Sequence, residues 1–223
     1  MEIAANVHVI PSRIVNAYLI VDADGLTLID TGLARNGKQI LNYIAGLGYS
    51  PQDLKHIVIT HADGDHVGGL AALKAASGAR VYASPVEAEA IAAGRMSREL
   101  KLRGLLKWLF AAAAPLFKVK PAAVDERVAD GQVLPALGGL RVVATPGHTP
   151  GHISLFAPAA GVLFVGDSLV SEREGLRPSR GANTWDKAKA LESVRLQAAL
   201  GAHVVCPAHG SVVKDAVGRF PDV

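Results

Sequence analysis

Cysteine is almost missing from this 223-residue chain, which contains only Cys206. An intrachain disulfide and a cysteine-rich zinc site are therefore both excluded. Residues 1–6 also lack the basic start and apolar stretch of a signal peptide, so we predict a cytoplasmic protein.

Long apolar runs and strong charge are missing as well. The nearest approach to a membrane span, residues 104–117, is interrupted by Lys107 and Pro115, so we expect no stable membrane insertion. The net charge of +3 is small and spread along the chain, and it gives no reason to expect a nucleic-acid partner. Hydrophobic residues make up 50% of the chain and charged residues 19%, which favours a folded core over disorder.

Short apolar segments alternate with helical patterns in both halves of the chain. The apolar and β-branched runs predict strands at 7–10, 17–21, 26–30, 56–60, 79–83, 140–144, 153–156, 162–165 and 204–206. Helical spacing predicts helices at 38–47, 70–76 and 185–200, the last with Thr184 as its N-cap. Residues 86–120 are rich in Ala, Leu, Arg and Lys and predict a helical insert or lid. This order favours a single α/β domain, residues 1–223, built as a layered sandwich.

The strongest functional signal follows the predicted strand at 56–60. The sequence Thr-His-Ala-Asp-Gly-Asp-His-Val-Gly-Gly places four potential metal ligands within six residues, namely His61, Asp63, Asp65 and His66. So many polar and ionisable groups on one turn would repel one another or go unsatisfied in a dry interior, whereas a bound dication would satisfy them. A solvated polar turn is the alternative interpretation.

Three more residues with ligating side chains each follow a predicted strand. They are His148, Asp167 and His209. A histidine at a strand end is by itself more often a surface or structural residue than a ligand. Because loops gather where strands end, the repeated arrangement nevertheless predicts one shared site.

The chain resembles the metallo-β-lactamase-fold hydrolases, including the glyoxalase II and lactonase branches. The resemblance rests on Leu-Ile-Asp-Thr-Gly at 28–32, the loop 61–66, and the segments 145–148, 166–167 and 207–209, which agree with that family in order and spacing. It implies a four-layer αββα sandwich with a two-metal site along one edge.

The resemblance also implies a role for each matching residue. The first metal ion would be held by His61, Asp63 and His148, and the second by Asp65, His66 and His209. Asp167 would bridge the two ions. Asp30 would orient the metal loop without touching a metal.

By the same resemblance the protein would be a hydrolase. A hydroxide held by two divalent metal ions would attack the carbonyl carbon of an ester, thioester, lactone or related acyl bond, and Asp65 would orient that hydroxide. Zinc is the metal expected of the family, with iron or manganese as alternatives.

Position 63 departs from the family pattern, which usually has histidine where this chain has Asp63. Two dications bring four positive charges, of which Asp65, Asp167 and a hydroxide remove three, and Asp63 removes the fourth. We therefore expect a weaker Lewis acid and a shift in preference from zinc toward iron or manganese. Two alternatives stay open, an iron-dependent oxidoreductase similar to the flavodiiron branch and a non-catalytic metal-binding or sensing protein.

The segment from Arg98 to Phe117 bears on the substrate. Its density of leucine and aromatic residues exceeds one helical face and suggests a wall for an acyl or apolar small molecule, with ordinary packing as the alternative. The same insert could form a homodimer surface. We assign no site role to the remaining histidines and the single thiol. His56, His152 and His203 are interpreted as structural and Cys206 as a buried inert thiol, and His8 is left without a role.

Overall fold

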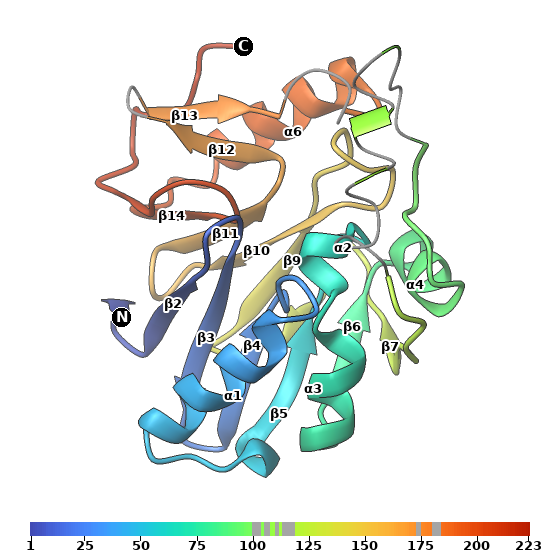
Figure 1. Ribbon diagram of the computed structural model, residues 1–223. Helices are drawn as coiled ribbons and strands as arrows, with labels where there is room; N and C mark the ends of the chain where they lie inside the picture. Colours follow the sequence, from blue (N-terminus) through green and yellow to red (C-terminus); the bar gives the residue numbers. More distant parts are fainter. Residues whose placement is uncertain (100–103, 105–107, 110–111, 113–118, 173–174, 180–183) are drawn as a thin grey trace.

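A computed structural model gives the fold of the chain (Figure 1). It describes residues 1–99, 104, 108–109, 112, 119–172, 175–179 and 184–223. Much of the second half of the predicted insert at 86–120 therefore lies outside the described residues, namely 100–103, 105–107, 110–111 and 113–118. Its first part is α4 (Pro85–Ala92), a helix with Ser84 as its N-cap.

The first half of the chain forms a seven-stranded sheet in which the strands follow one another in chain order. These strands are β1 (Glu2–Ala4), β2 (Val7–Pro11), β3 (Asn16–Asp22), β4 (Gly25–Ile29), β5 (Leu54–Val58), β6 (Arg80–Ala83) and β7 (Glu126–Arg127). The pairs from β1 to β4 are antiparallel, and those from β4 to β7 are parallel. Parallel neighbours need crossover connections, which α1 (Asn36–Gly46) supplies between β4 and β5 and α3 (Leu70–Ser77) between β5 and β6.

The second half forms a six-stranded sheet with the order β15-β14-β11-β10-β9-β8. These strands are β8 (Val133–Leu134), β9 (Leu140–Ala144), β10 (Ile153–Ala157), β11 (Val162–Gly166), β14 (Val204–Pro207) and β15 (Val213–Lys214). A separate hairpin consists of β12 (Leu169–Glu172) and β13 (Gly175–Pro178), and α6 (Lys187–Ala198) lies between β13 and β14 in the chain.

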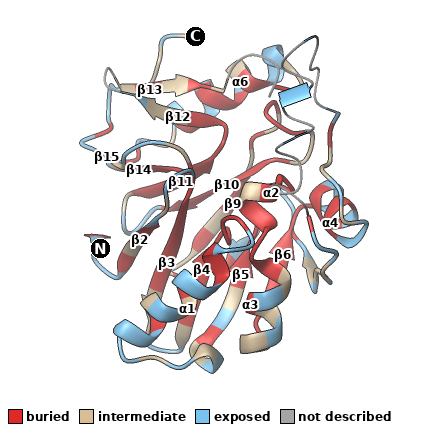
Figure 2. Ribbon diagram, viewed as in Figure 1, coloured by how far each residue is buried: buried red, intermediate tan, exposed pale blue. Residues whose placement is uncertain are grey.

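Three apolar clusters separate four layers. One lies between the first sheet and helices α1 and α3, the second between the two sheets, and the third between the second sheet and α6. Successive residues of a strand belong to different clusters, as Leu28 and Ile29 of β4 do, because side chains alternate across a sheet. The strands are accordingly buried on both faces (Figure 2), and the αββα sandwich is confirmed.

The predicted elements agree with the structure except at several ends. The strand expected at 56–60 begins at Leu54 and ends at Val58. The segment that follows was expected as an open loop, but it includes a helical turn, α2 (Gly64–Val67). No strand was predicted for β1, β7, β8, β12, β13 or β15, which are short.

The predicted start of the last helix was wrong. Helix α6 begins at Lys187, and its N-cap is Asp186, whose carboxylate accepts hydrogen bonds from the amides of Ala188 and Lys189. Trp185 is not helical because its amide donates to the carbonyl of His148 instead. Thr184 therefore caps nothing, since a tertiary contact decides where the helix begins.

No helix within the described ranges has the length and apolar character needed to cross a bilayer.

Candidate metal centre

All seven predicted ligands lie at one edge of the sandwich, in the segments that follow four strands. The loop from His61 to His66 comes after β5 of the first sheet. His148, Asp167 and His209 come after β9, β11 and β14 of the second. Because β11 and β14 are parallel neighbours, Asp167 and His209 leave the sheet at the same edge. The site thus joins both halves of the chain.

The first group of side chains consists of His61, Asp63 and His148, whose ligating atoms all lie within 4.8 Å of one another. The Oδ2 atom of Asp63 lies 3.6 Å from Nε2 of His61 and 3.3 Å from Nε2 of His148. We call this group the first half-site.

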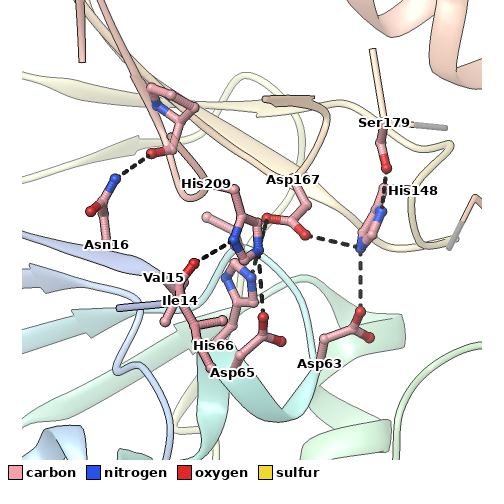
Figure 3. Close-up of polar contacts among 12 residues, drawn as sticks. Ile14, Val15, Asn16, Asp63, Asp65, His66, His148, Asp167, Ser179 and His209 are labelled. Carbon is pink, nitrogen blue, oxygen red and sulfur yellow. Dashed lines mark hydrogen bonds and ion pairs between the residues drawn. The ribbon is translucent and has the colours of Figure 1, made fainter. Parts of the chain in front are cut away.

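The second group consists of Asp65, His66 and His209, and we call it the second half-site. Nε2 of His209 lies 3.4 Å from Oδ2 of Asp65. The Asp167 carboxylate lies between the two groups (Figure 3). Its Oδ1 atom is 3.2 Å from Nε2 of His66 and 3.3 Å from Nε2 of His209, whereas its Oδ2 atom is 3.5 Å from Nε2 of His148.

The spacing and burial of these atoms fit divalent ions. Atoms that ligate one tetrahedral ion at about 2.0–2.2 Å stand about 3.3–3.6 Å apart, which matches the separations above. Within the seven side chains of the cluster, four buried atoms have no hydrogen-bond partner among the described residues: Nε2 of His61, Nε2 of His66, Oδ1 of Asp63 and Oδ1 of Asp167. Unpaired buried polar atoms are costly, and metal coordination would satisfy them.

The other ring nitrogen of each histidine is held by the protein. Nδ1 contacts Thr60 Oγ1 in His61, Asp30 Oδ2 in His66, Ser179 Oγ in His148 and the Ile14 carbonyl in His209, at 2.7–3.0 Å. A proton held on Nδ1 leaves the Nε2 lone pair facing the centre, which is the tautomer that a metal ligand needs.

Asp30 supports both half-sites, although it lies outside the cluster of ligating atoms. Its Oδ2 atom lies 2.8 Å from Nδ1 of His66 and accepts a hydrogen bond from the hydroxyl of Thr60, which in turn contacts His61. Its Oδ1 atom accepts from the Thr60 amide. The backbone of Asp30 has a φ of 58°, in the left-handed region that only a few residue types tolerate.

In the second half-site, nearby carboxylates raise the pKa of both histidines. Burial alone would lower the pKa of His66, but the carboxylates of Asp167, Asp30 and Asp65 raise it well above its ordinary value. Burial opposes the same change at His209, where contacts with Asp167 and Asp65 raise the pKa to about 10. Both imidazoles are therefore protonated on both nitrogens and positively charged at neutral pH in the metal-free protein.

The first half-site has a different charge balance. Burial lowers the pKa of His148 below its ordinary value, so this imidazole is neutral at pH 7. Burial would raise the pKa of Asp63, but contacts with His148 and His61 and the charge of Arg98 hold it well below its ordinary value. Asp63 is thus a carboxylate beside a neutral imidazole.

Arg98 was considered only as part of the insert, yet it touches the predicted ligands. Its Nη2 atom lies 2.5 Å from Oδ2 of Asp63 and 3.0 Å from Nε2 of His148. The side chain is only 2% exposed. No periodicity or motif in the sequence distinguishes this arginine from its neighbours.

Glu87 is a second residue that sequence reasoning missed. This fully buried carboxylate accepts hydrogen bonds from the Ala62 amide, the Thr149 hydroxyl, the Gly151 amide and the Ser97 hydroxyl. It therefore ties the His61 loop and the His148 loop to the start of α4. An acidic residue in the first turn of a helix is ordinary, so no local pattern indicates this role.

His152 and Cys206 are both buried. Nε2 of His152 accepts a hydrogen bond from the Asp167 amide and Nδ1 contacts Thr145, so this histidine holds the Asp167 loop rather than facing the cluster. Burial lowers the pKa of His152 well below its ordinary value, which keeps the ring neutral. Burial raises the pKa of the Cys206 thiol, which makes it a poor nucleophile.

A pocket of about 390 Å³ opens onto the cluster. His148, Asp167 and His209 line it, as do Arg177 and Glu172, which form an ion pair of 3.0 Å. This volume is within the range of small-molecule sites.

Solved structures of known proteins share this fold. The chain is similar to TTHA1429, a metallo-beta-lactamase family protein from Thermus thermophilus, with a TM-score of 0.74 and 28% identity, covering 97% of this chain and 77% of that one. It is also similar to TTHA1623, which was solved in a di-iron-bound form, with a TM-score of 0.71 and 26% identity, covering 96% of each chain.

Curated relatives match as well. The uncharacterized protein YobT of Bacillus subtilis is 29% identical over 92% of this chain and 87% of its own length. The hydroxyacylglutathione hydrolase of Rhodobacter capsulatus is 38% identical over 53% of this chain. The atrochrysone carboxyl ACP thioesterase of Aspergillus fumigatus is 26% identical over 90%. The matches span only 35% and 38% of the length of these last two relatives.

A sequence profile of one family covers most of the chain, from residue 10 to residue 209, and so includes all seven residues of the cluster. With its αββα sandwich and its histidines and aspartates at the sheet edge, the chain belongs to the metallo-beta-lactamase superfamily.

Proposed function

We propose that the protein is a metal-dependent hydrolase that cleaves an ester, thioester, lactone or related acyl bond. The observation that carries the proposal is the position of Asp167, whose two carboxylate oxygens face different groups of ligating atoms. A carboxylate placed in this way suits a pair of ions held side by side, which is a common arrangement in hydrolytic enzymes.

The roles of the residues follow from their positions. His61, Asp63 and His148 would hold one divalent ion, and Asp65, His66 and His209 the other. When bound, the ions would supply an activated water and polarise the carbonyl of the substrate. The side chain of Asp65 is 16% exposed, against 12% for Asp63 and 11% for Asp167, and we assign it the positioning of that water.

The names of two relatives support an acyl substrate. One is a hydroxyacylglutathione hydrolase and the other an ACP thioesterase. Because the matched regions are only about a third of those proteins, the substrate class is a proposal for this chain. An apolar wall formed by the insert also stays a proposal, because most of residues 100–118 lie outside the described part.

The test is reconstitution of metal-stripped protein with zinc, manganese or iron, followed by a panel of ester, thioester, lactone, β-lactam and phosphodiester substrates. We expect hydrolysis of at least one acyl substrate that chelation abolishes and one metal restores. His209→Ala should lose metal and activity together. His203→Ala is the matched control, since His203 precedes β14 at the opposite end of that strand. Full activity in stripped protein or in His209→Ala would contradict the proposal.

An iron-dependent oxidoreductase is the second candidate. Asp63 supplies an oxygen where the family usually has a nitrogen, and TTHA1623 was solved with two irons. Elemental analysis of the aerobically purified protein, with an oxygen-consumption assay, separates the candidates. Bound iron with oxygen uptake and no acyl hydrolysis would favour the oxidoreductase.

A further inference from the structure

Arg98 lies six residues after the end of α4, and the residue before it, Ser97, is hydrogen-bonded to that helix. The hydroxyl of Ser97 donates to Oε1 of Glu87 at 2.9 Å, and Glu87 also holds the His61 and His148 loops. Arg98 therefore shares one rigid support with the residues that it contacts.

The guanidinium of Arg98 touches two of the three ligating atoms of the first half-site. Nη2 lies 2.5 Å from Oδ2 of Asp63 and 3.0 Å from Nε2 of His148. These two atoms are themselves 3.3 Å apart, the spacing expected of ligands to one ion. The guanidinium thus uses the same atoms that a metal ion would use.

Arg98 and a metal ion would compete for His148, but they can share Asp63. An arginine nitrogen has no lone pair, so its contact with His148 requires that Nε2 carry no proton and offer its single lone pair. That lone pair cannot serve a guanidinium and a metal ion at the same time. Asp63 has a second oxygen, Oδ1, without a hydrogen-bond partner among the described residues, so its carboxylate can bind both.

The charge of Arg98 also disfavours a metal ion in the first half-site. The positive charge of Arg98 offsets the negative charge that Asp63 adds to the site, so the site regains the net charge of a centre with histidine at position 63. The guanidinium also repels a dication beside it. Within the described ranges the contacts of Arg98 are with Asp63 and His148, which both belong to the first half-site.

The guanidinium of Arg98 has hydrogen-bond donors that are not satisfied. Its Nε and Nη1 atoms are buried and have no partner among the described residues. Movement of the side chain toward water would satisfy these donors and offset part of the loss of the contact with His148. Arg98 can therefore be displaced.

We propose that Arg98 is a positioning residue that acts as a built-in competitor of the metal ion in the first half-site, paired with Asp63 and His148 in the metal-free protein and displaced from His148 on metal binding. The inference rests on the metal binding that the proposed function requires. It predicts that metal affinity is reduced in the first half-site only.

The experiment is calorimetric zinc titration of the metal-stripped full chain, together with anomalous diffraction from crystals grown at limiting zinc. Arg98→Gln should strengthen one binding step about tenfold or more, as loss of a hydrogen bond from a charged donor implies. The same variant should shift occupancy toward the position beside His61, Asp63 and His148. Arg95→Gln is the matched control, because Arg95 is exposed and donates only to the Met96 carbonyl among the described contacts.

Arg98→Lys provides an independent variant in case Arg98→Gln does not fold. It keeps the charge but replaces the planar guanidinium, whose Nη2 atom reaches both acceptors, with a compact ammonium group, so we expect a smaller gain in affinity at the same half-site. Unchanged affinity in the variants, or an equal gain in Arg95→Gln, would overturn the inference while leaving the proposed function intact. If the wild-type protein bound no zinc at either half-site, the proposed function itself would fail.

Discussion

The two half-sites share Asp167 but hold their charges in opposite ways. In the first, a carboxylate is paired with the arginine at position 98, and the imidazole of His148 is neutral. In the second, three carboxylates surround His66 and hold its proton. A metal ion must therefore displace the guanidinium from His148 in the first half-site and protons from the imidazoles of the second, although each half-site has two histidines and one aspartate.

The largest effect is expected where the two half-sites meet. Asp167→Asn keeps the shape of the side chain but leaves one ligating oxygen in place of two, so a shared ligand is lost. We expect metal content to fall from two ions to one or fewer, and activity to fall on the order of a thousandfold. Elemental analysis and steady-state kinetics measure both, with Asp24→Asn in an exposed turn as the control. Two retained ions with near-normal turnover would contradict the bridging role.

Asp30→Asn should affect the second half-site more than the first. Asp30 contacts His66 directly, but reaches His61 only through Thr60. Asparagine tolerates the same left-handed backbone, so the variant removes the charge without forcing a new conformation. We expect affinity to fall about 10- to 100-fold in the second half-site and less in the first, measured by zinc titration. Equal losses would show that Thr60 transmits the effect fully.

The pH dependence of binding should distinguish the half-sites next. The pKa of His209 is raised to about 10 and that of His66 is raised as well, so both imidazoles must release a proton when an ion binds. Affinity in the second half-site should therefore rise as pH increases, about tenfold per pH unit for each proton released, until the pH passes the raised pKa. The lowered pKa of His148 predicts a much weaker dependence in the first. Calorimetry in buffers of different ionisation enthalpy counts the protons, and equal counts for both ions would contradict this difference.

Glu87→Gln should have the smallest effect on metal binding. The amide keeps the size of the side chain, but its NH₂ group faces donors that Glu87 now satisfies. We expect the free energy of unfolding to fall by about 2–4 kcal/mol and metal affinity in the first half-site to fall only a few-fold. Thermal denaturation and zinc titration measure the two changes. Glu89→Gln is the control on the exposed face of the same helix.

The elements and candidate ligands that could be predicted are marked by patterns of neighbouring residues in the sequence. His61 to His66 stand in a dense run after a β-branched strand, and His148, Asp167 and His209 each follow a strand whose apolar residues alternate between two cores. A strand buried on both faces is readily recognised, and its end defines where loops gather. These features depend on neighbours in the sequence.

The features that were missed depend on contacts between distant residues. Arg98 reaches Asp63 across 35 residues and His148 across 50, and Glu87 reaches Thr149 across 62. The start of α6 is set by a backbone contact between Trp185 and His148, not by the threonine that precedes it. Nothing in the pattern around these residues reports such partners, because the fold alone brings them together.

The central claim is that two cations are held side by side with Asp167 between them. Anomalous diffraction from crystals grown with ample zinc tests it most directly. We predict two peaks, one beside His61, Asp63 and His148 and one beside Asp65, His66 and His209, with a carboxylate oxygen of Asp167 near each. A map with no peak in this cluster, or with the imidazoles turned away from a shared centre, would contradict the account.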